Sequence, residues 1–293
     1  MHYLLFILLC LIWASSFILM KKAALSFGPL TIAGLRCLGG ALLLAAVWKL
    51  FRRTAPPTRR HVPWLLLTTL LGYGYPYAVQ PYLVHRYGSG FIGMMICFVP
   101  LITILFSMPV LRVFPTRWQL VGVLGGLACM AVIMADGLRR EVPALALLLA
   151  LSVPASYALC NTLIKRHFTA LSPYILALTS MGLATLFVLP LGAASESVTP
   201  GGPFWLSVAC VVTLGILGTG AATVMFFKLI QDRGPLFAGL VTYIVPLGAL
   251  LWGWADAEKV TALQFLALLG VLSMVAVVQW ELSRASRSNS PGA

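Results

Sequence analysis

The sequence predicts an all-α integral membrane protein with ten transmembrane helices, arranged as two inverted five-helix repeats. Three observations lead to this prediction: an apolar composition, a series of long apolar runs, and an internal repeat. Of the 293 residues, 60% are hydrophobic and only 9% are charged, whereas soluble domains carry roughly 25% charged residues. The apolar runs are continuous rather than alternating, which argues against a transmembrane β-barrel.

Long apolar runs follow one another along the chain with short polar breaks. A helix needs about 20 apolar residues to cross the hydrocarbon core of a bilayer. The ten predicted spans cover residues 3–20, 30–49, 64–83, 90–110, 118–135, 143–164, 173–193, 204–229, 236–254 and 261–280. The first has no basic residue ahead of it and no small-residue cleavage site behind it, so we expect it to be retained.

All six cysteines fall inside the predicted spans. In that position a cysteine behaves as a small apolar residue. We therefore expect no disulfide framework, no metal site and no cofactor.

The net charge of +13 indicates membrane topology rather than nucleic-acid binding. If the N-terminus is cytoplasmic, the cytoplasmic segments hold 13 of the 20 lysines and arginines, and the outer segments hold six. Basic loops stay in the cytosol, so we expect both termini there, in a multi-pass protein of the bacterial inner (plasma) membrane. Five acidic residues fall in the outer segments: Asp136, Glu141, Glu196, Asp256 and Glu258.

The chain contains an internal repeat. Residues 237–247, FAGLVTYIVPL, match residues 91–101, FIGMMICFVPL, and the same alignment pairs Gly72 with Gly218. Near the start of each half, WASS at 13–16 corresponds to PASY at 154–157, and Pro29 corresponds to Pro173. The predicted domains are a first repeat, 1–135, a second repeat, 143–283, and a polar cytoplasmic tail, 284–293.

Each repeat holds five spans, so the second enters the membrane from the opposite side. Inverted repeats let one fold adopt two mirror-related openings around a site near mid-depth. A duplication that only doubled a helical bundle is the alternative interpretation.

The two halves resemble the EamA branch of the drug/metabolite transporter superfamily. The resemblance covers nearly the whole chain and includes IWASSFILMKKA and LRCLGGALLL in the first half and DRGPLFAGLVTYIVPL in the second. Residues 257–261, AEKVT, are similar to the family's Gly-Glu-x-x-Thr turn, with alanine in place of glycine. The corresponding residues 112–116, RVFPT, contain no glutamate, and Pro154 stands where the family usually has tryptophan.

That resemblance implies a ten-helix exporter of amino acids or other small metabolites. It also implies that helices 1 to 4 and 6 to 9 surround a central cavity, while helices 5 and 10 stand at the edge.

Polar side chains within the spans predict a substrate site, because buried polar groups in a membrane face the bundle interior. Tyr73, Tyr77 and Gln80 share one helix face, and the repeat sets Thr219 and Thr223 opposite them. The predicted substrate-binding residues are Trp13, Ser15, Ser16, Tyr73, Tyr77, Gln80, Cys97, Ser156, Tyr157, Asn161, Thr219, Thr223, Thr242 and Tyr243. Helix packing is the alternative role for each serine and threonine, and core filling is the alternative for Trp13.

Proline and charge within the spans add two further expectations. Pro100 and Pro246 are predicted hinges, because proline removes a helix hydrogen bond. Arg36 could extend outward to the interface or hold a substrate carboxylate, and its place toward the outer side of its span favours a structural role. No aspartate or glutamate lies within any predicted span, which favours facilitated diffusion or exchange over proton coupling.

The sequence thus favours an exporter of small metabolites, most of all amino acids and among them aromatic ones. The expected partners are a small-molecule substrate and the lipid bilayer, with no nucleic acid and with a monomer as the default state. The alternatives are a transporter of nucleosides, sugars or drug-like molecules, and a lipid-interacting membrane subunit without transport. We predict no catalytic residues, because the sequence has no nucleophile elbow, H-E-x-x-H motif or phosphate loop.

Overall fold

The computed structural model describes residues 2–48, 57–112, 114, 116–139, 141–169, 171–199, 203–226, 228–229 and 241–288. Within these ranges every regular element is helical. Parts of the second and eighth predicted spans, residues 236–240 of the ninth, and residues 289–293 of the predicted tail lie outside them.

Helical segments occupy the five predicted spans of the first half. They are α1 (His2–Ala23), α2 (Pro29–Ala46), α3 (Val62–Thr69) with the π-helical η3 (Leu70–Gly74) and α4 (Tyr75–Tyr87), α5 (Ser89–Met94) with the 3-10 turn η4 (Met95–Phe98) and α6 (Val99–Leu111), and α7 (Arg117–Arg139).

Helical segments also occupy the five predicted spans of the second half. They are α8 (Ala144–His167), α9 (Pro173–Ser195), α10 (Phe204–Thr213) with the π-helical η5 (Leu214–Ala221), α12 (Val241–Ala255) and α13 (Ala262–Ser288). Since α13 continues to Ser288, the first five residues of the predicted polar tail are helical.

Among the described residues, six helical stretches are long and apolar enough to cross a membrane: residues 2–23, 29–46, 89–111, 144–167, 173–195 and 204–226. Three shorter apolar helices cover residues 120–136, 241–255 and 262–277. The continuous helical stretch from Val62 to Tyr87 is less apolar, because tyrosine, proline and glutamine residues lie along it. Outward faces carry exposed large side chains such as Leu11, Leu186 and Trp254, and apolar surfaces of this extent suit contact with lipid.

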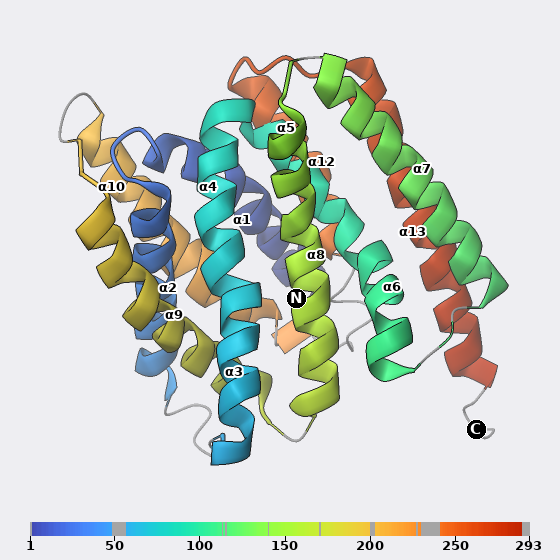
Figure 1. The fold of residues 1–293 in the computed structure, drawn as a ribbon, viewed down its shortest axis with the longest axis horizontal. Helices are drawn as coiled ribbons and strands as arrows, with labels where there is room; N and C mark the ends of the chain where they lie inside the picture. Colours follow the sequence, from blue (N-terminus) through green and yellow to red (C-terminus); the bar gives the residue numbers. More distant parts are fainter. Residues whose placement is uncertain are drawn as a thin grey trace.

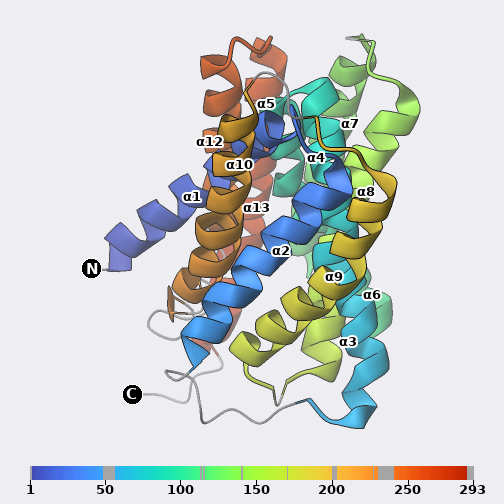
Figure 2. The same cartoon turned by 90° about the vertical axis from the view of Figure 1, so that its left-hand side faces the viewer.

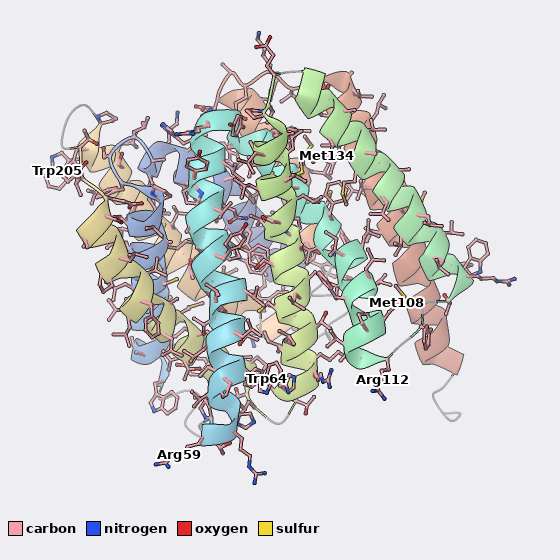
Figure 3. The ribbon with its side chains drawn as sticks, viewed as in Figure 1. Arg59, Trp64, Met108, Arg112, Met134 and Trp205 are labelled. Atoms are coloured by element: carbon pink, nitrogen blue, oxygen red, sulfur yellow. The ribbon has the colours of Figure 1, made fainter. Side chains whose placement is uncertain are left out.

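The helices alternate in direction, so their ends gather at two ends of the bundle (Figure 1). We call the upper one the acidic end, because Asp136, Glu196, Asp256 and Glu258 lie in the helix ends and turns there. The lower one is the basic end. Figure 3 shows Arg59 and Arg112 at the basic end.

Helices at equivalent places in the two repeats make matching contacts. The first helix of each half packs on the fourth span of the other, α1 on α12 and α8 on α6. Likewise α2 packs on α9, and α7 packs on α13 at one edge of the bundle (Figures 1 and 2). Helix α1 ends beside Glu258 at the acidic end, whereas α8 ends at the basic end.

The expectation that no aspartate or glutamate lies within a spanning helix needs correction. The predicted fifth span stops at residue 135, but α7 continues to Arg139 and therefore includes Asp136. This carboxylate is 6% exposed and accepts a hydrogen bond from Gln264 Nε2 at 2.8 Å. Asp136 thus belongs to the contact between α7 and α13 at the acidic end.

Candidate functional site

Two helical segments are wound more widely than an α-helix, and they lie at equivalent places in the two halves. These are η3 and η5, which contain the paired residues Gly72 and Gly218. A π-helical segment disturbs the regular carbonyl pairing and often lies at a functional site. In both segments a side chain from the opposite half donates to a carbonyl. Ser156 Oγ donates to Leu71 O at 2.7 Å, and Trp13 Nε1 donates to Gly218 O at 3.2 Å.

Glycine at these two positions permits close helix approach. A Cβ atom on Gly72 would lie 2.9 Å from Cys160 Sγ, and one on Gly218 would lie 3.0 Å from Ser16 Oγ. The first helix of each half therefore packs directly on the π segment of the other.

A cavity of about 440 Å³ lies beside the two π segments. Its wall takes side chains from the first four spans of each half and, among the described residues, none from α7 or α13. This is the arrangement that the family resemblance implies. The volume falls within the range of about 300–1,000 Å³ of small-molecule sites.

Nine of the fourteen predicted substrate-binding residues lie in the cavity wall. They are Trp13, Ser16, Tyr73, Tyr77, Gln80, Tyr157, Asn161, Thr223 and Thr242. They come from helices that are far apart in the sequence, and the fold brings them together around one space. Substrate binding by these residues stays a prediction.

The other five lie outside the wall. Ser15 Oγ donates to the carbonyl of Leu11 in its own helix, and Ser156 bonds to η3. Cys97 is fully buried in the core, and Tyr243 packs against that core. Thr219 accepts a hydrogen bond from Arg36 behind the wall. Substrate binding by these five residues also stays a prediction.

The list of predicted substrate-binding residues did not include several wall residues, among them Ser180 and Arg36, for which the sequence left an interfacial and a carboxylate-binding role open. The repeat supplied a signal for both. The offset that pairs Pro29 with Pro173 also pairs Arg36 on α2 with Ser180 on α9. Phe17, Met20 and Leu176 also line the wall, but apolar residues within apolar helices carry no such signal.

Arg36 points into the bundle and does not extend to the interface. Its side chain is 5% exposed, and Nε donates to Thr219 Oγ1 at 2.8 Å. The guanidinium lies over the ring of Tyr77, with Cζ 4.0 Å from the ring centroid. Stacking of this kind is a favourable cation–π contact.

Aromatic rings form much of the remaining wall. Tyr73 and Tyr77 meet edge to face with their centroids 5.7 Å apart, and Trp13 lies 5.3 Å from Phe226. Edge-to-face and tilted pairs are the favoured geometries of aromatic rings. The wall therefore combines rigid apolar surfaces with a few polar groups.

The cavity extends toward the basic end. Its lining includes Pro173, the first residue of α9, and Ile164, near the last turn of α8. On the other side it reaches Met20, one residue before the charged contacts of the acidic end.

An ion-pair network joins the helices just beyond the cavity at the acidic end. Lys21 Nζ lies 2.6 Å from Glu258 Oε1 and 2.7 Å from Asp256 Oδ2, and Lys22 Nζ lies 2.6 Å from Asp256 Oδ1. Glu258 also accepts the backbone N–H groups of Ser89 at 2.7 Å and Gly90 at 2.9 Å. One carboxylate thus connects α1, α5 and the turn after α12.

The network favours the ionised form of its carboxylates. Burial by itself would raise the pKa of Glu258, but hydrogen bonds from Lys21, Gly90 and Ser89 together outweigh it and hold that pKa below its ordinary value. Asp256 has a lowered pKa for the same reason, since burial is outweighed by its bonds with Lys21 and Lys22. A carboxylate bound by several donors is stabilised in its charged form.

The two predicted hinges differ in local structure. Pro100 lies in the first turn of α6, directly after the 3-10 turn η4, where a missing N–H costs little. Pro246 lies inside α12 and is buried. Their role as hinges stays a prediction.

The EamA-like transporter family model matches residues 1–135 and 144–279. Among curated proteins, "uncharacterized transporter YvbV" of Bacillus subtilis is 24% identical over 293 residues, covering 99% of this chain and 94% of that protein. "Uncharacterized inner membrane transporter YedA" of Escherichia coli K12 is 25% identical over 277 residues, covering 92% and 87%. These similarities extend over nearly the full length of each chain.

A solved crystal structure has the same fold. It aligns with a TM-score of 0.63 and covers 97% of this chain and 98% of its own, at 20% sequence identity. At that identity the likeness concerns the fold alone.

Proposed function

Since this chain belongs to the EamA-like transporter family, we propose that it exports small metabolites, with aromatic amino acids as the first expected class. The protein is a multi-pass membrane transporter, and its relatives carry transporter names. We propose further that ten transmembrane helices form two inverted repeats that alternate between two openings.

The observation that carries this proposal is a cavity between the halves with unequal surroundings. The ion pairs of Lys21 and Lys22 join the helices beyond it at the acidic end, while the wall continues toward the basic end. In alternating access, substrate sites lie near mid-depth between inverted repeats. The described contacts suit a state in which the substrate enters the cavity from the basic end while the acidic end is closed.

Direction follows from charge. Basic segments stay in the cytosol, so the basic end and both termini are proposed to face the cytoplasm of a bacterial inner membrane. Loading from that side leads to export. Among the described residues no carboxylate lines the cavity, so facilitated diffusion or exchange is proposed over proton coupling, by a monomer.

The cavity wall supports amino acids as substrates. The hydroxyl and amide groups of Tyr73, Tyr77 and Gln80 line it together with aromatic rings. A few placed polar groups in an otherwise apolar wall are typical of small-molecule sites. The volume also admits nucleosides or sugars, which remain the alternative cargo.

Uptake into inside-out vesicles tests the proposal. Vesicles that contain the protein are expected to take up radiolabelled aromatic amino acids, and Tyr77→Ala or Gln80→Ala should each lower the uptake rate by about tenfold by removing polar contacts with the substrate. Tyr82→Ala, which alters an exposed tyrosine of the same helix, is the matched control and should leave uptake unchanged.

Two outcomes would redirect the proposal. Uptake of nucleosides or sugars without amino acids would replace the cargo class. Phospholipid movement with no solute uptake would favour the lipid-interacting alternative.

A further inference from the structure

Arg36 carries the one positive charge in the described cavity wall. It lies on α2, seven residues after Pro29, and its side chain is 5% exposed. Charge at this depth in a membrane protein is costly and usually marks a functional site.

The guanidinium is only partly satisfied by the protein. Nε donates to Thr219, and Nη1 lies 3.5 Å from the sulfur of Met20. A guanidinium has five N–H donors. Within the described part of the chain, the other three N–H groups have no protein acceptor and no carboxylate forms an ion pair with Arg36.

The surroundings hold this unsatisfied group in place. Thr219 accepts the hydrogen bond from Nε, and the ring of Tyr77 stacks on one face of the guanidinium, with its centroid 4.0 Å from Cζ. Thr219 also donates to Leu214 O within η5 at 2.9 Å, so the π segment positions the threonine. A guanidinium held by its Nε and one face keeps its terminal N–H groups available to a ligand.

The chemistry that fits a planar fork of donors is a carboxylate, which binds arginine through two parallel hydrogen bonds. A buried cation that has no anionic partner among the described residues also gains most from a ligand of opposite charge. The neighbouring rings of Tyr77 and Tyr73 offer contact to an aromatic or apolar body.

The described wall offers no carboxylate that could form an ion pair with an ammonium group. Gln80 and Asn161 provide neutral amide oxygens, and no described aspartate or glutamate lines the cavity. The amino group of an amino acid would find no ion pair there.

We propose that Arg36 binds the carboxylate of the transported molecule and that the cavity selects aromatic carboxylates, with or without an ammonium group. This inference rests on the transport function proposed above and narrows it to a charge class. It predicts that a ligand needs its carboxylate more than its amino group.

Four compounds with the same phenyl ring separate the requirement for a carboxylate from the requirement for an amino group. L-Phenylalanine carries a carboxylate and an ammonium group, phenylpropanoate a carboxylate alone, phenethylamine an ammonium group alone, and phenylpropanamide neither. Binding is measured as thermal stabilisation of the purified detergent-solubilised protein over a concentration series. Both carboxylates should bind, and the amine and the amide should bind at least about 30-fold more weakly, as expected for losing charged hydrogen bonds.

Variants of Arg36 test whether this residue binds the carboxylate. Arg36→Gln should weaken both carboxylates by about 30-fold, and Arg36→Lys should fall between, because lysine keeps the charge without the planar fork. Arg86→Gln is the matched control. Arg86 also stacks on a tyrosine, with Cζ 4.3 Å from the Tyr82 ring centroid, but that pair is exposed and outside the cavity. It should change binding by less than about twofold.

The inference is wrong if phenethylamine binds as well as phenylpropanoate, if no carboxylate binds the wild-type protein, or if folded Arg36→Gln binds like wild type. The ligand series on wild-type protein decides the question even if Arg36→Gln fails to fold. Transport in reconstituted vesicles separates the two proposals. Binding without transport leaves this inference and removes the function, whereas Arg36-independent transport of amines leaves the function and removes this inference.

Discussion

The two ends of the bundle are formed by equivalent helices, but different interactions hold them. At the acidic end, Lys21 and Glu258 form a charged contact that also caps α5. At the basic end, Arg166 donates to the carbonyl of Val110 at 2.8 Å in an exposed position, and Trp64 stacks on His167. The corresponding contacts between α1 and α12 and between α8 and α6 thus differ in charge.

This difference shows that two halves with the same backbone fold can be held together by interactions of different strength. The turn at 257–261 carries a glutamate, and its counterpart at 112–116 carries none. An ion pair that is partly shielded from water is stronger than an exposed hydrogen bond from a charged donor to a neutral carbonyl. We therefore expect the acidic end to be harder to open than the basic end. By contrast, we expect the two π segments to contribute equally to transport.

Removing the charge of Glu258 should have the largest effect. Glu258→Gln loses the ion pair with Lys21 and weakens the bonds to Ser89 and Gly90, which should shift the population toward opening at the acidic end by roughly 10- to 100-fold. Ile96, which lines the cavity, serves as a reporter when replaced by cysteine in a cysteine-free background. Labelling by an impermeant maleimide from the acidic side should rise in the variant.

Glu196→Gln provides the control for this measurement. Glu196 also caps a helix at the same end, accepting the N–H groups of Leu30 at 2.9 Å and Thr31 at 2.8 Å, but no lysine forms an ion pair with it within the described ranges. If both glutamines raised labelling equally, helix capping rather than the ion pair would hold the end closed.

Filling the glycine position of either π segment should have the next largest effect. Gly72→Ala places a methyl group 2.9 Å from Cys160 Sγ, and overpacking of this kind costs about 1–3 kcal/mol. We expect transport to fall by about tenfold, and Cys160→Ala in the same chain should restore much of it. Gly218→Ala should behave alike, relieved by Ser16→Gly. A loss in one half only would contradict the equivalence of the two segments.

Hydrophobic runs and the repeat were enough to locate helices in all ten predicted spans, because continuous apolar runs of this length favour helix. The helix ends were less predictable. Asp136 is polar, yet α7 continues through it, since Gln264 of α13 supplies a buried partner. That partner lies 128 residues away and leaves no local signal.

The candidate site was predictable where polar groups recur in both halves. Tyr77 and Thr223 lie in the wall as the repeat suggested, but Thr219 turns behind it. There its hydroxyl accepts from Arg36 Nε and donates to Leu214 O, two contacts that local sequence does not indicate. Its repeat partner Tyr73 lies in a π segment as well, yet it lines the cavity. No pattern of residues in the sequence indicated the π winding, although the paired glycines marked its place.

The basic end should respond weakly to a change in its charged contact. Arg166→Ala removes one exposed bond to Val110 O, and exposed interactions contribute about 0–1 kcal/mol. Labelling of the Ile96→Cys reporter from the acidic side and the transport rate should both stay within about threefold of the parent. A change as large as that of Glu258→Gln would remove the proposed difference between the ends.

The pH dependence of the acidic end should be the smallest effect. Because the pKa values of Glu258 and Asp256 lie below their ordinary range in the closed network, that network favours closure at every pH above the ordinary carboxyl pKa of about 4. The preference weakens only as pH falls through the lowered pKa values. Spin labels at the exposed positions Leu25 and Lys259 report the separation of the two turns. Their distance should stay constant from about pH 8 to pH 5 and increase below about pH 4, whereas a transition near neutral pH would mean that a histidine or an amine, and not these carboxylates, controls the end.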